Sequence, residues 1–67
     1  DMPTSTTHLR IQLRLHEQFF RNLRVGMGVL RGKRRSMAYD PTIIRVQDLC
    51  GEIEQALYQI RKSLERR

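Results

Sequence analysis

The spacing of apolar residues in the C-terminal half most constrains what this chain can fold into. Apolar residues recur there at alternating intervals of three and four positions, at Ile43, Val46, Cys50, Ile53, Leu57, Ile60 and Leu64. Three heptads of this pattern form one apolar stripe along an α-helix. Asp40 can cap the start of that helix, and Pro41 suits its first position. The sequence therefore predicts a helix over about 41–65.

The N-terminal half carries a similar stripe. Residues 9–16 alternate apolar and polar like a strand, but no second strand is available to pair with them. The helical pattern fits a longer window, with residues at Leu9, Leu13, His16, Phe20, Leu23, Met27 and Leu30. We therefore predict a helix over about 7–30, preceded by a flexible segment over 1–6 and followed by a basic loop over 31–40.

The glycines leave the end of this first helix open. Gly26 and Gly28 each cost roughly 1 kcal/mol inside a helix, so one interpretation is that the helix ends near Arg24. Because Met27 and Leu30 continue the stripe, we favour a helix that continues past Gly26 to about Leu30. At Gly26 the missing side chain would let another helix approach closely. Gly32 is then the expected stop.

Two helices joined by a short loop predict an all-α fold, an antiparallel helical hairpin. Matching the two stripes head to tail places Arg21 and Arg24 opposite Asp48 and Glu52. Such exposed pairs add little stability but favour one register.

Further apolar residues lie outside the stripes, and one hairpin cannot cover them all. Ile11, Leu15, Phe19 and Val29 are in the first helix, and Ile44, Leu49 and Tyr58 are in the second. A chain of 67 residues with one cysteine has no internal disulfide to reinforce a thin core. We therefore expect two hairpins to dimerise into a four-helix bundle, although a helix of another protein would serve as well. The expected core and dimer interface comprises Leu9, Ile11, Leu13, Leu15, His16, Phe19, Phe20, Leu23, Met27, Val46, Leu49, Ile53, Leu57, Ile60 and Leu64.

The formal net charge of +6 raises a second hypothesis, binding to nucleic-acid phosphates. One basic cluster lies in the expected loop, at Arg31, Lys33, Arg34 and Arg35. The hairpin would form a second at its open end, from Arg10, Arg14, Arg61, Lys62, Arg66 and Arg67. Arginine suits phosphate because its planar fork donates two hydrogen bonds. A solvated basic surface explains both clusters equally well.

No catalytic or metal-binding arrangement is evident. His16 has no acid or nucleophile at helical spacing, and Cys50 has no neighbouring base, so both are expected to be core or interface residues. We expect no enzyme activity, cofactor, metal or membrane span. One free cysteine favours an intracellular location, and the basic loop favours the nucleus over the cytoplasm. The predicted function is dimerisation or oligomerisation of a larger protein, with nucleic-acid binding or docking of a partner's helix as alternatives.

Overall fold

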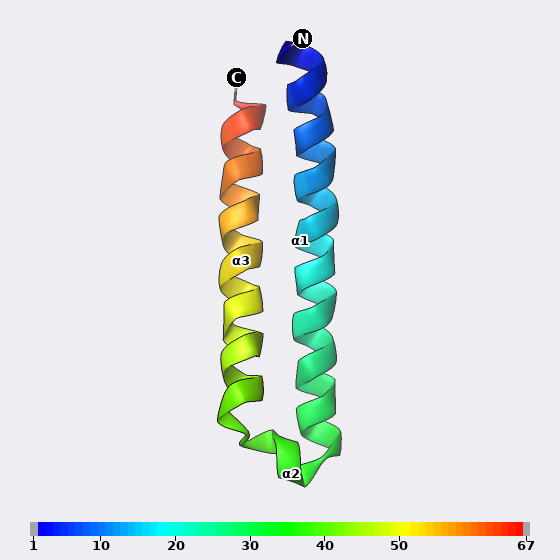
Figure 1. Cartoon of the computed structure of the whole chain (residues 1–67), viewed down its shortest axis with the longest axis vertical. Helices are drawn as coiled ribbons and strands as arrows, with labels where there is room; N and C mark the ends of the chain where they lie inside the picture. Colours follow the sequence, from blue (N-terminus) through cyan, green and yellow to red (C-terminus); the bar gives the residue numbers. More distant parts are fainter. Residues whose placement is uncertain (1, 67) are drawn as a thin grey trace.

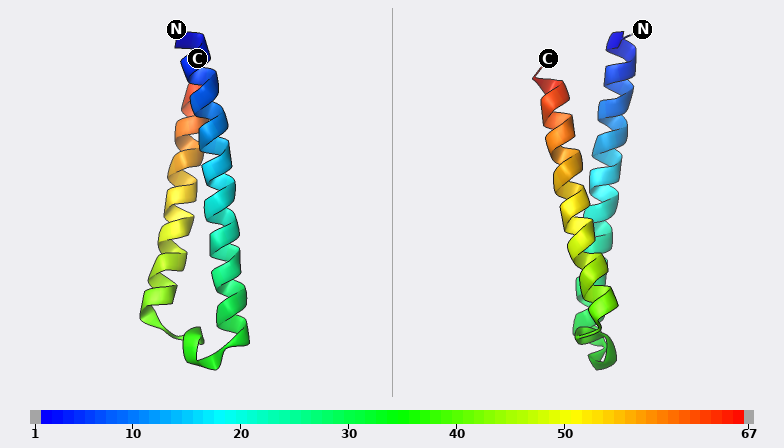
Figure 2. Two further views of the ribbon diagram at one scale, coloured as in Figure 1. Left: turned by 45° about the vertical axis from the view of Figure 1, so that its right-hand side comes forward. Right: turned by 60° about the vertical axis from the view of Figure 1, so that its left-hand side comes forward.

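A computed structural model describes residues 2–66, and these residues form three helices and no strand. They are α1 (Met2–Lys33), α2 (Arg35–Ala38) and α3 (Pro41–Glu65). The predicted all-helical class is therefore confirmed. Figures 1 and 2 show α1 and α3 side by side and antiparallel, with both ends of the chain at one end of a rod measuring 51 × 14 × 13 Å.

Helix α1 is longer than the sequence predicted at both ends. It begins at Met2 instead of near residue 7, so the segment expected to be flexible is helical from Met2 onward. Pro3 is tolerated in the first turn, because a backbone N–H there has no acceptor within the helix. The expected stop at Gly32 is wrong. The N–H of Arg34 donates to the Leu30 oxygen at 3.0 Å, and no described glycine has a positive φ, so α1 runs through Gly32 to Lys33.

The helix also continues past Gly26 and Gly28, but the expected close approach at Gly26 is absent. A Cβ added at Gly26 would meet nothing within 4 Å. The close contacts occur instead at Gly28, where a Cβ would lie 3.2 Å from Gln47 Nε2, and at Gly51, where it would lie 3.5 Å from Arg24 Cδ. These two glycines bring α1 and α3 together along one side.

The turn between the long helices is held by Arg31, which lies in α1 and not in the loop that the sequence predicted. Its Nε donates to the Ala38 oxygen at 3.0 Å, and its Nη1 donates to Gln47 Oε1 at 2.7 Å. One side chain thus joins α1, the end of α2 and α3.

Helix α3 has the bounds and the cap that the sequence predicts. The Asp40 carboxylate accepts the N–H groups of Thr42 at 2.8 Å and Ile43 at 3.2 Å, and Pro41 opens the first turn. These bonds satisfy backbone donors that have no partner inside the helix.

Candidate interaction surface

Only half of each predicted stripe faces the other helix. Residues seven positions apart lie almost above one another on a helix and are called a row here. The row of α1 that faces α3 contains Leu13, Phe20 and Met27, and the matching row of α3 contains Ile43, Cys50, Leu57 and Leu64. Leu13 and Cys50 are the only buried apolar residues in the described part of the chain, with 7% and 3% exposed. The core between the two helices is therefore thin.

A second row on each helix completes the contact, and it is polar. On α1 this row is Arg10, Glu17, Arg24 and Arg31, and on α3 it is Gln47, Glu54 and Arg61. These rows were not predicted, because the two stripes are defined by apolar residues alone. Their signal was the seven-residue spacing of polar residues beside each stripe.

The most enclosed contact between the polar rows joins Glu17 to Arg61. Arg61 donates from Nε to Glu17 Oε2 at 2.6 Å and from Nη2 to Oε1 at 3.2 Å, and the Glu17 side chain is only 6% exposed. Nη1 of Arg61 donates to Glu65 at 2.9 Å. The bonds to Glu17, and then those to Glu65, raise the pKa of Arg61, while the bond from Arg61 lowers the pKa of Glu65. Arg61 is therefore held by two carboxylates.

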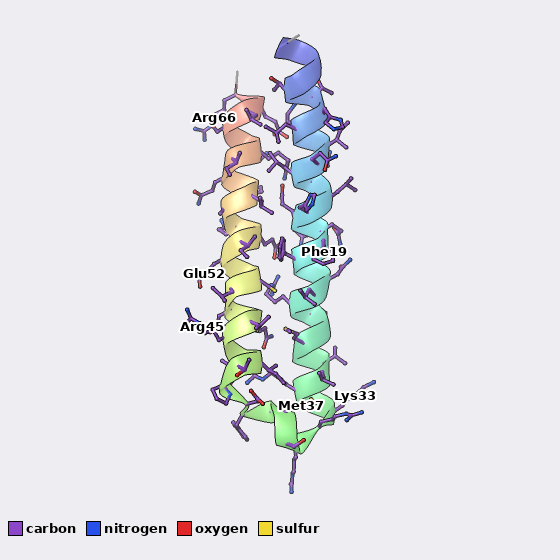
Figure 3. The ribbon with its side chains drawn as sticks, viewed as in Figure 1. Phe19, Lys33, Met37, Arg45, Glu52 and Arg66 are labelled. Atoms are coloured by element: carbon purple, nitrogen blue, oxygen red, sulfur yellow. The ribbon has the colours of Figure 1, made fainter. Side chains whose placement is uncertain are left out.

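Glu54 provides the second contact between the polar rows. Arg21 Nε donates to it at 2.8 Å and Arg24 Nη2 at 3.2 Å, and the hydrogen bond from Arg21 is the main reason that the pKa of Glu54 is lowered. The prediction that Asp48 and Glu52 lie opposite these arginines is wrong. Both acids are exposed and belong to outer rows of α3, and Figure 3 shows Glu52 pointing away from α1.

All of these polar contacts lie on one side of the helix pair, which we call the ion-pair side. Arg21 and Gly28 share the row next to the polar row of α1, and Gly51 lies next to that of α3. Because the helices are antiparallel, the equivalent flanks of both helices lie on the same side of the pair. The flanks beyond the two apolar rows must then share the opposite side.

That opposite side carries the other half of each predicted stripe, and we call it the apolar side. It consists of Leu9, His16, Leu23 and Leu30 from α1 and of Val46, Ile53 and Ile60 from α3. Four of its side chains are substantially exposed: Leu9 at 46%, Leu23 at 38%, Ile53 at 39% and Ile60 at 48%. Large contiguous apolar patches on a protein surface are a common feature of interaction sites.

The additional apolar residues of α1 are even more exposed. Ile11, Leu15, Phe19, Val25 and Val29 all have more than half of their surface exposed. Leu15, His16 and Phe19 line a shallow hollow, in which His16 donates from Nδ1 to the Gln12 oxygen at 2.7 Å. His16 is therefore an exposed residue of this surface and not part of the core between α1 and α3.

The structure divides the predicted phosphate-binding residues. Arg31 holds the turn, Arg61 is paired with Glu17 and Glu65, and Lys62 lies 3.5 Å from Glu65. Arg10 donates to Thr7 at 3.4 Å. The exposed residues of the predicted set are Lys33, Arg34 and Arg35 near the turn and Arg14, Lys62 and Arg66 toward the open end. Arg67 lies outside the described residues.

Other kinds of site find no support among residues 2–66. No group of three or more histidine, cysteine or acidic side chains lies close enough to hold a metal ion. None of the described helices has the length and apolar character needed to cross a membrane.

Comparison of the chain with protein-family models, with curated proteins and with solved structures finds no match.

Proposed function

We propose that this chain is a helical hairpin whose function is self-association, with two copies packing their apolar sides together as a four-helix bundle. The observation that carries the proposal is the segregation of the helix pair into an ion-pair side and an exposed apolar side. In an antiparallel bundle each helix directs its apolar stripe toward a common axis and touches two neighbours. The stripes of α1 and α3 point in this way, since each lies half between the helices and half on the apolar side.

Charge supports a second copy as the partner. The apolar side contains no Asp, Glu, Lys or Arg from Leu9 to Ile60, and His16 is its one titratable residue. Two such sides can meet without opposing like charges, although each chain has a net charge of +6. An acidic partner would have no counter-charges on this side.

The expected energy makes the association dependent on concentration. Covering a half-exposed Leu, Ile or Phe side chain contributes roughly 1 kcal/mol. Leu9, Leu23, Ile53 and Ile60 of two copies would together contribute on the order of 10 kcal/mol. Association itself costs about 4–15 kcal/mol, so the dimer should form within an accessible concentration range.

The direct test is absolute mass by light scattering on a sizing column, over a range of protein concentrations and at moderate and high salt. We expect a dimer that persists at high salt, because apolar contacts are not screened. Ile53→Glu should reduce the dimer fraction, whereas Gln55→Glu, on the outer surface of α3, should not. A monomer at all concentrations, or equal masses for both variants, would contradict the proposal.

Nucleic-acid binding remains a second candidate because Lys33, Arg34 and Arg35 are exposed together at the turn. It predicts binding to DNA or RNA that weakens steeply with salt and falls when these three residues are changed to Gln. Neutralising Arg45 on α3 is the matched control. Both functions are compatible with a module of a larger intracellular protein. The free Cys50 suits a reducing compartment, and the basic turn favours the nucleus over the cytoplasm.

A further inference from the structure

The charges of α1 are confined to two neighbouring rows. Between Leu9 and Leu30, every charged residue lies either on the polar row that faces α3 or on the row of Arg14 and Arg21 beside it. The other four outward rows have no Asp, Glu, Lys or Arg, and together they cover an arc of about 200°. They comprise Leu9, Ile11, Gln12, Leu15, His16, Gln18, Phe19, Asn22, Leu23, Val25, Gly26, Val29 and Leu30.

Helix α3 does not share this property. Its equivalent outer rows carry exposed charges of both signs, at Arg45, Asp48, Glu52, Lys62 and Arg66. Figure 3 shows Arg45 and Glu52 on the surface of α3 that points away from α1. The outer surface of α3 is thus charged, whereas that of α1 between Leu9 and Leu30 is uncharged and carries several exposed apolar side chains.

A face-to-face packing of the two apolar sides would cover only the part of the uncharged arc nearest to α3. It would leave Leu15 and Phe19, which are 62% and 58% exposed, at the edge of the bundle. An exposed helix surface that lacks charge over a wide arc and carries several large apolar side chains fits a helix with more than one helical neighbour. A direct contact with a third helix would cover these residues.

We propose that α1 is the central helix of the assembly, with the α1 helices of two copies packed directly against each other and the α3 helices at the periphery. This inference rests on the proposed self-association and adds which helix forms the seam. Two copies of an uncharged arc meet without repulsion. Gly26 lies on the arc with open space around it, so the second helix can approach closely there. The surface is continuous with the apolar side, so one interface includes both.

Disulfide crosslinking tests the arrangement in the full chain. In a Cys50→Ala background, single cysteines replace, one at a time, five outward residues of α1 and five at matched spacing on α3. The α1 positions are Gln12, Leu15, Phe19, Asn22 and Gly26, and the α3 positions are Leu49, Glu52, Ala56, Gln59 and Ser63. A disulfide needs two Cα atoms within about 7 Å, so a cysteine links to its own copy only where equivalent helices touch.

We expect at least one α1 position to give mostly covalent dimer under mild oxidation, and the α3 positions to remain largely unlinked. The masses of the reduced proteins are measured in parallel. A dimer of the correct mass that links through α3, or through neither helix, overturns the central position of α1 but leaves self-association intact. A reduced protein that is monomeric overturns both.

Isosteric charge changes give an independent readout. Asn22→Asp places two carboxylates in the proposed α1 seam, whereas Gln59→Glu adds the same charge to the outer surface of α3. Each 1.4 kcal/mol of repulsion weakens dimerisation tenfold, so we expect Asn22→Asp to raise the dimer dissociation constant by about tenfold or more. Gln59→Glu should leave it nearly unchanged. Equal effects of the two substitutions contradict the inference.

Discussion

At the scale of single residues, Glu17 and Arg61 form the best-enclosed polar contact of the chain. Glu17 is the one buried charged residue among those described, and both of its oxygens accept from Arg61. Removing one member of an enclosed ion pair leaves the other without its partner, which costs more than the pair itself contributed.

We therefore expect Glu17→Gln to lower the melting temperature of the protein. Glu65→Gln should lower it less, because Glu65 is 35% exposed and can be replaced by water as a partner of Arg61. Thermal unfolding followed by circular dichroism compares the two variants. An equal fall in melting temperature for both variants would mean that the Glu17–Arg61 contact stabilises the fold no more than the Arg61–Glu65 pair within α3.

The acidic partners of the arginines also make stability depend on pH. Hydrogen bonds from Arg21 to Glu54 and from Arg61 to Glu65 lower the pKa values of these carboxyls in the folded protein. A group whose pKa is lower in the folded than in the unfolded state stabilises the fold above its unfolded pKa, and this contribution is lost as the pH falls through the folded pKa.

Melting temperatures should therefore be highest near neutral pH and fall as the pH drops below about 4.5, the ordinary value for Glu. The Glu54→Gln variant should lose less stability than the parent over the same acid range. An unchanged acid profile in this variant would show that Glu54 is not held by Arg21 and Arg24 in solution.

At the scale of helices, the cap of α3 offers a clean test. Asp40 accepts two backbone N–H groups, and replacing an N-cap Asp by Ala typically costs about 1 kcal/mol. Asp40→Ala should reduce the free energy of unfolding by about that amount, as measured by urea titration. Asp48→Ala is the control, because Asp48 is exposed within the same helix.

At the end of α1, by contrast, we expect a substitution that stabilises the protein. Gly32 is helical and a Cβ there would meet nothing within 4 Å, so Gly32→Ala should stabilise the protein by about 0.5–1 kcal/mol. Gly28→Ala should gain less, since its Cβ would press on Gln47 at 3.2 Å. A loss of stability in Gly32→Ala would mean that the helix stops there, as the sequence first indicated.

The sequence was sufficient to predict the helical class and the start of α3, because the stripe and the cap at Asp40 are both local signals. The end of α1 could not be predicted in the same way. In the sequence Gly32 resembles the glycine that commonly ends a helix. The hydrogen bonds of Arg31 that hold the turn involve Ala38 and Gln47, which come close to it only after folding.

The orientation of the stripes was also beyond the sequence. An apolar stripe specifies which surface avoids water, but it does not say which edge of that surface meets the neighbouring helix. In the structure both helices are rotated so that the polar rows, with the ion pairs of Glu17 and Glu54, face the neighbouring helix in place of the second half of each stripe. The apolar residues Leu23 and Ile53 are consequently left on the apolar side.

At the scale of the whole molecule, stability and association should be coupled. Two buried apolar residues give the single chain a small core, so a partner that covers the apolar side should also stabilise the fold. The melting temperature should therefore rise with protein concentration, by calorimetry, and stay constant in the Ile53→Glu variant. A melting temperature independent of concentration in the parent would mean that the single chain is stable alone.

The sorting of charge onto two rows of α1 has a consequence for how its length can vary. Deleting one residue at Gly26 would turn residues 2–25 by about 100° relative to residues 27–33, because each residue advances a helix by that angle. Arginines would then enter the uncharged arc, and apolar residues would face the polar row of α3. Removing seven residues instead shortens the rod and leaves every row in place. Insertions and deletions in α1 should accordingly be tolerated better in steps of seven than in steps of one, although a step of seven within residues 10–24 also changes the partners of Arg61 and Glu54.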